Sequence, residues 1–136
     1  MFRSIIVPID IAQKEKSARM IASARQLLDA GGKVTLVNVV EATPLYEMAE
    51  LMAEMRTKAA EDARAYLTGL AAQEKLDAEI EVNQGHAAMV ILDIAREKGA
   101  DAIVIASHRP GLQDYFLGST AARVVRHAPC SVLILR

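Results

Sequence analysis

The feature that most constrains the fold is a strict alternation of short apolar runs with longer helical patterns. Runs rich in Val, Ile and Leu predict strands, and they lie at residues 4–10, 33–40, 78–85, 101–107 and 131–136. The segments between them predict helices over 14–30, 45–72, 87–99 and 119–128. Because strands and helices alternate in this way, the chain is predicted to form an α/β fold with a doubly wound parallel sheet.

The strand patterns also predict the order of the sheet. Residues 78–82 alternate between apolar and polar side chains, which suits an edge, whereas the other runs suit strands buried on both faces. Right-handed crossovers then predict the order 3-2-1-4-5, with a crevice beyond the carboxyl ends of the first and fourth strands. On helix 14–30 we expect one apolar stripe, ended by the glycines at 31 and 32. Its members are Ala18, Ile21, Ala22, Ala24, Leu27 and Leu28.

Length and charge narrow the possible functions. A chain of 136 residues that is 52% hydrophobic suits a single domain spanning 1–136. The net charge of -1 argues against sequence-independent binding of nucleic acid. The single cysteine, Cys130, has no partner for a disulfide and is expected to be a small buried side chain. With no apolar stretch long enough to span a membrane, we expect a cytoplasmic protein without a membrane or nucleic-acid partner.

Asp10 is the first candidate site residue, because it follows the first predicted strand. Its carboxylate has two interpretations: it caps the following helix, or it accepts hydrogen bonds from a ligand such as a ribose, or helps to hold a cation. Pro8, which has no N–H, indicates that the chain is already leaving the sheet ladder there.

The segment from His108 to Leu117 is longer than an ordinary connection between a strand and a helix. It carries Arg109, a fixed positive charge suited to phosphate, and it leads to Gly118, Ser119 and Thr120 at the start of a helix. Free N–H groups and the helix dipole make that start a candidate anion site. The alternative is structural, with Ser119 as a helix cap and Arg109 as a solvated charge. His108, without an evident partner, suits a ligand contact or a loop hydrogen bond better than a catalytic base.

Other patterns point toward structure. Met48, Met52 and Met55 recur at helical spacing and predict packing against the core or a partner. Gly85 satisfies a turn or allows close approach of a ligand. His86 and His127 have no third ligand at metal spacing, and neither GxxxxGK[ST] nor GxGxxG is present.

The segments "IIVPID", "IASHRP" and "YFLGSTAARVVRHAPCSVLILR" resemble the universal stress protein family, particularly its F/G-like branch. The resemblance implies a five-stranded, Rossmann-like fold of the adenine nucleotide alpha hydrolase-like type, usually dimeric. Some branches bind ATP through Gly-x-x-Gly, nine residues, then Gly-Ser/Thr. Here Gly118-Ser119 matches the end of that pattern, whereas Ala106 and Arg109 replace the earlier glycines and eight residues separate Arg109 from Gly118.

Carried over by position, the resemblance implies a nucleotide site that holds ATP, ADP or AMP, with Mg as an accompanying ion. Pro8, Ile9 and Asp10 would line the adenosine side, Val39 would meet the adenine, and Ala106 would lie under the ribose. The segment Ser107–His108 would border the site. The phosphates would be held by Arg109, Gly118, Ser119 and Thr120.

Two classes of function remain open from the sequence. The first is a nucleotide-binding stress-response or signalling protein, for which no evident base supports hydrolysis or self-phosphorylation. The second is a nucleotide-independent dimeric module that contacts a protein partner. In either case we expect a homodimer, because the apolar run 131–136 would otherwise be an exposed edge.

Overall fold

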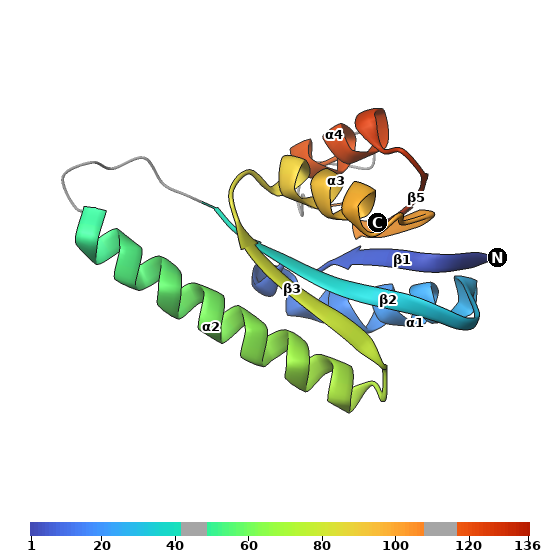
Figure 1. The fold of residues 1–136 in the computed structure, drawn as a ribbon, viewed down its shortest axis with the longest axis horizontal. Coiled ribbons are helices and arrows are strands. Elements are labelled where there is room, and N and C mark those ends of the chain that lie inside the picture. Colours follow the sequence, from blue (N-terminus) through green and yellow to red (C-terminus); the bar gives the residue numbers. More distant parts are fainter. Residues whose placement is uncertain (42–48, 108–116) are drawn as a thin grey trace.

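The computed structural model describes residues 1–41, 49–107 and 117–136, with the side chain of Ala49 left aside. Five parallel strands form one sheet in the order β3-β2-β1-β4-β5, so the predicted fold and strand order are confirmed (Figure 1). The strands are β1 (Phe2–Pro8), β2 (Leu28–Val40), β3 (Ala78–Gln84), β4 (Ala102–Ala106) and β5 (Ser131–Leu135). β3 lies at an edge, as its alternating pattern predicts.

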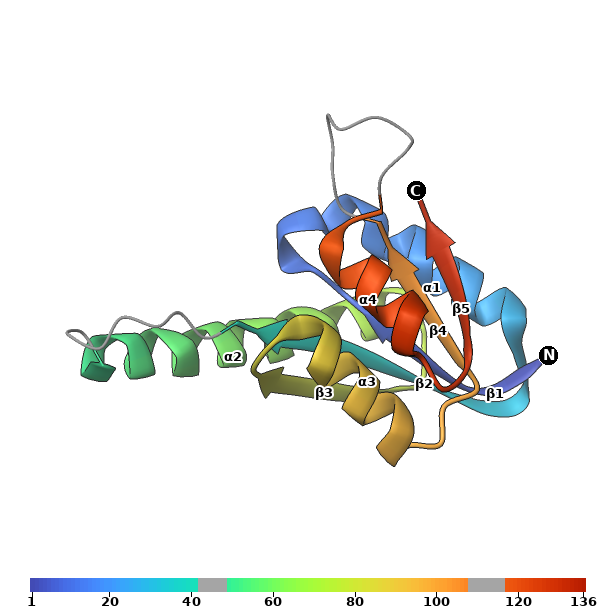
Figure 2. The same cartoon turned by 90° about the horizontal axis from the view of Figure 1, so that it is seen from above.

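Helices cover both faces of this sheet, as Figures 1 and 2 show from two directions. One face is covered by α1 and α2, and the other by α3 and α4. The helical segments are the 3-10 helix η1 (Ile11–Lys16), α1 (Ser17–Leu27), α2 (Ala49–Gln73), α3 (Ala87–Glu97) and α4 (Ser119–His127).

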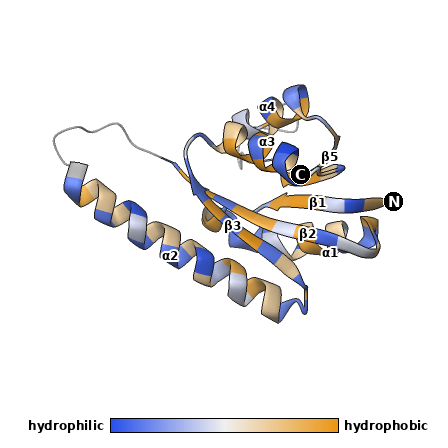
Figure 3. Cartoon of the chain, in the orientation of Figure 1, coloured by the Kyte–Doolittle hydropathy of each residue, from blue (hydrophilic) through white to orange (hydrophobic). Residues whose placement is uncertain are grey.

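The core lies in two layers because successive side chains of a strand point to opposite faces. In β1, Ile5 and Val7 pack in the cluster with α1 and α2, whereas Ile6 packs in the cluster with α3 and α4. All three are fully buried. Figure 3 shows hydrophobic segments along the strands and hydrophilic positions along the helices that cover them. The central strands are thus buried on both faces, which explains why their sequences are nearly continuous apolar runs.

The predicted helix over 14–30 is wrong in its limits, and its predicted stripe is confirmed only in part, because Ile21, Ala24, Leu27 and Leu28 pack in or against the core. The backbone leaves helical geometry at Gln13, α1 ends at Leu27, and Leu28 already pairs with Phe2 in the sheet. The glycines at 31 and 32 therefore lie within β2 and do not end the helix. On α1 the buried face is Ser17, Met20, Ile21 and Ala24, while Ala18 and Ala22 are exposed. The two alanines were misplaced because alanine tolerates either environment and so carries little information on which face of the helix is buried.

Helix α2 is only partly covered. In Figure 2 its amino-terminal half extends beyond the sheet, whereas its later turns pack against it. Met55 is 55% exposed and Met52 is half-buried, so the methionine pattern does not mark a core stripe, and Met48 lies outside the described residues. Among the helices of the described segments, none has the length and apolar character needed to cross a membrane.

Candidate functional site

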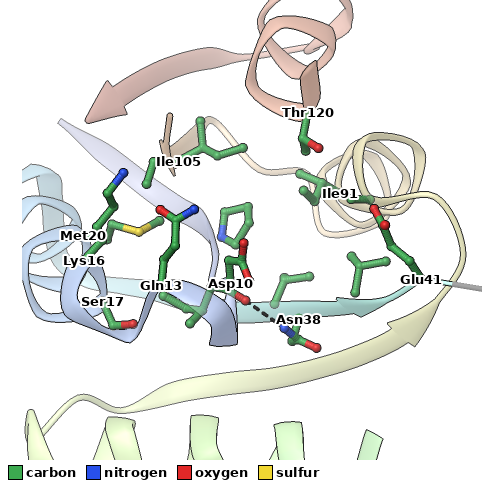
Figure 4. A pocket seen from close by; sticks show the side chains of 16 residues that line it. Asp10, Gln13, Lys16, Ser17, Met20, Asn38, Glu41, Ile91, Ile105 and Thr120 are labelled. Carbon is green, nitrogen blue, oxygen red and sulfur yellow. Dashed lines mark hydrogen bonds between the residues drawn. The ribbon is translucent and has the colours of Figure 1, made fainter. Parts of the chain in front are cut away.

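A cavity of about 410 Å³ opens beyond the carboxyl ends of the strands. It includes the point where the strand order reverses, since β1 pairs with β2 on one side and with β4 on the other. This is the default position for a ligand in a doubly wound sheet. Figure 4 shows side chains from η1, α1, β2, α3, β4 and α4 converging on it. Segments that are distant in the sequence therefore line one cavity, whose volume is large enough for a small ligand.

The structure brings most of the predicted site residues to this cavity. Those that line it are Pro8, Ile9, Asp10, Val39, Ala106 and Thr120. Ser107, Gly118 and Ser119 lie beside it without lining it. The predictions for His108 and Arg109 fall outside the described residues.

Asp10 caps η1 and also lines the cavity, so its position is compatible with both predicted roles. Its Oδ1 accepts a hydrogen bond of 2.9 Å from the backbone N–H of Ala12, which caps η1. The side chain is nevertheless exposed and lines the cavity. The expectation that the chain leaves the ladder at Pro8 is wrong, because Pro8 still pairs with Val37 and the N–H of Ile9 donates to the carbonyl of Val37 at 2.7 Å.

Ser107 joins the two ends of the segment that separates β4 from α4. Its N–H donates to the carbonyl of Leu135 at 2.8 Å, and its Oγ accepts from the N–H of Gly118 at 3.3 Å. Ser107 is buried, so these bonds position the carboxyl end of β4 against the start of α4. As a result the N–H of Gly118 is not free, and Ser119 is exposed without lining the cavity. Thr120 is the residue of this turn that faces the cavity (Figure 4).

The wall formed by η1 and α1 was missed by sequence reasoning. It contributes Gln13, Lys16, Ser17 and Met20. Lys16 donates from Nζ to the carbonyl of Ser107 at 2.8 Å, and Ser17 shares a hydrogen bond of 3.2 Å with the hydroxyl of Tyr66 on α2. Gln13 and Ser17 are buried. Polar residues near a helix start are usually solvated, so the sequence carries no signal that this wall faces a cavity.

The opposite side of the cavity is built by the end of β2. Buried Asn38 donates from Nδ2 to the carbonyl of Ile9 at 2.8 Å, which fixes the chain after β1 (Figure 4). Val37, Ile91 and Ile105 give the cavity an apolar lining. The cavity thus combines apolar side chains with the polar side chains described above, as ligand cavities usually do.

The charges of the cavity are mixed. Among the lining residues that the structure describes, Lys16 is the only cation, and Asp10 and Glu41 supply two carboxylates. The described segments contain no group of three side chains able to hold a metal ion. Gly85 does not line the cavity, and its φ of 142° supports the turn interpretation, since L side chains rarely adopt that conformation.

Comparison with known proteins gives a family match over the whole chain. The model of the universal stress protein family matches residues 1–136. Universal stress protein G of Salmonella typhimurium is 28% identical over 142 residues, covering 100% of both chains. A universal stress protein of Thermus aquaticus is 32% identical over 140 residues, again covering 100% of both.

Solved structures of this family share the fold. Universal stress protein UspA from Lactobacillus plantarum has a TM-score of 0.71 at 25% identity, covering 98% of this chain and 97% of that one. A universal stress protein in complex with cAMP has a TM-score of 0.61 at 24% identity, covering 99% and 97%. The protein from Archaeoglobus fulgidus in complex with dAMP has a TM-score of 0.60 at 21% identity, covering 98% and 97%.

Proposed function

This chain belongs to the universal stress protein family, and on that premise we propose that the cavity at the carboxyl edge of its sheet binds an adenine nucleotide. The observation that carries the proposal is the convergence of residues from the ends of β1, β2 and β4 and the start of α4 on one cavity. The apolar lining suits a base, the rim suits a ribose, and Thr120 at the helix start lies where a phosphate would be favoured.

Two structurally similar members of the family, in complex with cAMP and dAMP, support the class of ligand. Both ligands are adenine nucleotides with one phosphate. For this chain the ligand is an adenine nucleotide such as AMP, ADP or ATP, with Mg accompanying the longer phosphate chains. Asp10 serves the ribose side, Val39 the adenine, and Arg109 with the start of α4 the phosphates.

The nucleotide-bound protein acts in this proposal as a dimeric stress-response or signalling protein. Dimerisation uses β5, the strand at the sheet edge opposite β3. Leu133 on β5 is exposed, and a sheet edge offers unpaired backbone groups for a second copy. Association across this edge would extend the sheet symmetrically.

A second candidate function is a nucleotide-independent interaction module. It is favoured by the amino-terminal half of α2, which extends beyond the sheet and exposes Leu51 and Met55. Exposed apolar side chains one helical turn apart suit contact with a protein partner. In this alternative the cavity would have no ligand.

Mass spectrometry of the gently purified protein distinguishes these functions. We expect AMP, ADP or ATP in roughly stoichiometric amount after acid release, and none from a variant in which Thr120→Phe fills the cavity. A parent protein that carries no nucleotide, and binds none after dialysis against millimolar AMP and ATP, would contradict the proposal and favour the interaction module.

A further inference from the structure

Gln13 is a buried polar side chain without a hydrogen-bond partner for one of its atoms. It is 7% exposed and lines the cavity, and its Nε2 has no partner among the described residues. A buried donor left in this state destabilises the folded protein. Figure 4 shows its amide between Asp10 and Lys16, within the set of side chains that surrounds the cavity. A ligand that offers an acceptor here would satisfy that donor.

Lys16 brings a positive charge to the same wall. Its ammonium has three N–H donors, of which one is used by the carbonyl of Ser107 at 2.8 Å. The side chain is half-buried and lines the cavity, where it faces a site whose other described charges are the carboxylates of Asp10 and Glu41. Because Lys16 is the only cation among the described lining residues, a negatively charged ligand group is favoured next to its remaining donors rather than next to the two carboxylates.

Two hydrogen bonds place Lys16 at the end of the cavity where α4 begins. Lys16 contacts the carbonyl of Ser107, and the Oγ of Ser107 accepts from the N–H of Gly118, which precedes α4. Since the Gly118 amide is already used, part of the anion site predicted from the Gly-Ser-Thr turn is occupied by the protein itself. Lys16 supplies donors beside this position, and Figure 4 shows the amide of Gln13 between Lys16 and Asp10.

We propose that η1 recognises the phosphate of the bound nucleotide, with Lys16 providing the charge and Gln13 a neutral donor. This inference rests on the proposed function and adds to it two residues that the Gly-Ser-Thr pattern does not include. A phosphate is favoured over the base or the ribose because it is the part of a nucleotide that offers acceptors with negative charge. Gln13 and Lys16 thereby select phosphorylated nucleosides over adenosine.

Calorimetric titration of the nucleotide-stripped full chain with adenosine and AMP tests this inference. We expect Lys16→Met to weaken AMP binding by about 10- to 100-fold, the range for a lost charge-assisted hydrogen bond, and to leave adenosine binding within about twofold. Lys16→Arg should restore most of the AMP affinity because it keeps the charge. Lys14→Met is the matched control, since Lys14 lies on η1 outside the cavity, over the ring of Tyr66.

Gln13→Met provides a second, independent signature. It should weaken AMP binding by about three- to tenfold without lowering the melting temperature of the ligand-free protein, because a donor without a partner is removed. If the role of Gln13 were purely structural, the Gln13→Met protein would have a lower melting temperature and would still prefer AMP over adenosine. If Lys16→Met does not fold, Lys16→Gln keeps a donor for the Ser107 carbonyl and removes only the charge.

The possible outcomes separate this inference from the proposed function. AMP binding at parental strength in the Lys16 and Gln13 variants would overturn the inference and leave the proposed function standing. Equal losses for adenosine and AMP would also overturn it, since they would show a general change of cavity shape. A parent that binds neither compound would overturn both.

Discussion

Polar groups are hydrogen-bonded differently at the two ends of the parallel strands, here called the amino edge, where the strands begin, and the carboxyl edge, where they end. At the amino edge, Asp101 accepts hydrogen bonds from the backbone N–H groups of Arg3 and Ser4, both at 3.0 Å, and its own N–H donates to the carbonyl of Ser4. At the carboxyl edge, Asp10 accepts a local bond from Ala12, and the Nε2 donor of Gln13 has no partner within the described ranges 1–41, 49–107 and 117–136. One edge is closed by its own hydrogen bonds, and the other encloses a cavity.

Under the proposed function, this difference assigns stability and nucleotide binding to opposite ends of the strands. The bonds of Asp101 tie the start of β1 to the turn before β4, where β1 shifts register against β2 between Phe2 and Ser4. At the carboxyl edge the Nε2 of Gln13 has no partner among the described residues, and a ligand with an acceptor could satisfy it. Substitutions at the two edges should therefore have separable effects, and each prediction below tests that separation.

The largest effect should follow from filling the cavity. Thr120→Phe places an aromatic ring into the space between α4 and the ends of the strands, so we expect AMP binding to fall by roughly 100-fold or more. Isothermal titration calorimetry measures this loss. Val125→Phe is the control, since Val125 is an exposed residue of the same helix and lies outside the cavity. Equal losses in both variants would contradict the assignment of the cavity.

A smaller effect is expected from Arg109, which follows the carboxyl edge in the sequence. Arg109→Ala should weaken ATP binding by roughly 1.5–3 kcal/mol if its contact with the phosphates is charge-assisted. The melting temperature of the ligand-free protein should change little. Combining this variant with Lys16→Met shows whether the two cations contact separate phosphate oxygens, in which case their free energies add. Unchanged ATP affinity would make the segment 108–117 a candidate partner-binding element.

At the amino edge the expected effect is on stability. Asp101→Asn should lower the free energy of unfolding by about 1–2 kcal/mol at neutral pH, because a carboxylate that accepts two backbone bonds becomes a neutral amide. AMP affinity should not change. Urea denaturation and calorimetry measure the two quantities, and a loss of affinity larger than the loss of stability would break the separation of edges.

The same residue predicts the direction of the pH dependence. The backbone N–H of Arg3, more than any other group, lowers the pKa of Asp101 below its usual value. A carboxyl with a lowered pKa in the folded state contributes stability above its unfolded pKa of about 3.9, and that stability disappears as the pH falls through the folded value. The difference in free energy of unfolding between the parent protein and Asp101→Asn should therefore be largest at pH 7 and decrease below about pH 4.

The smallest stability effect is predicted for Asp10. Loss of the cap in Asp10→Ala should cost about 1 kcal/mol, whereas Asp10→Ser keeps a capping oxygen and should cost less. A fall in AMP affinity for both variants would assign a ligand contact to the carboxylate in addition to its cap. Stability losses of equal size in both variants would contradict the capping role.

The sequence predicted the sheet because its signals are strong and local. The apolar runs that became β1, β2 and β4 lie inside the sheet, and the alternating run 78–82 became the edge strand β3. The expectation that the run 131–136 is buried on both faces is wrong, because β5 forms the other edge and exposes Ser131 and Leu133. Right-handed crossovers then leave few topologies. The position of the cavity followed from the strand order, and Asp10 and Thr120 were found from the residues that end the first strand and start the last helix. Val39 came from the family resemblance alone.

The η1 wall was not predictable because its geometry depends on tertiary contacts. Gln13 leaves helical geometry with φ of -128° and ψ of 54°, which no local residue pattern demands. Its burial, and the contact between Lys16 and the carbonyl of Ser107 91 positions away, exist only once β4 is in place. A polar residue inside a helical pattern is predicted to be solvated. The sequence therefore carried no signal that the donors of Gln13 and Lys16 line a cavity.

The most direct test of nucleotide binding at the carboxyl edge is to titrate the nucleotide-stripped, isotope-labelled protein with AMP. NMR spectra recorded during the titration measure the change in chemical shift of each backbone amide. We predict the largest shifts in residues 9–17, 38–41, 105–107 and 118–121, with Arg3, Ser4 and Asp101 at the amino edge unmoved. Shifts confined to the amino edge or to residues 50–59 of α2, or no shifts at millimolar AMP, would contradict binding at the carboxyl edge.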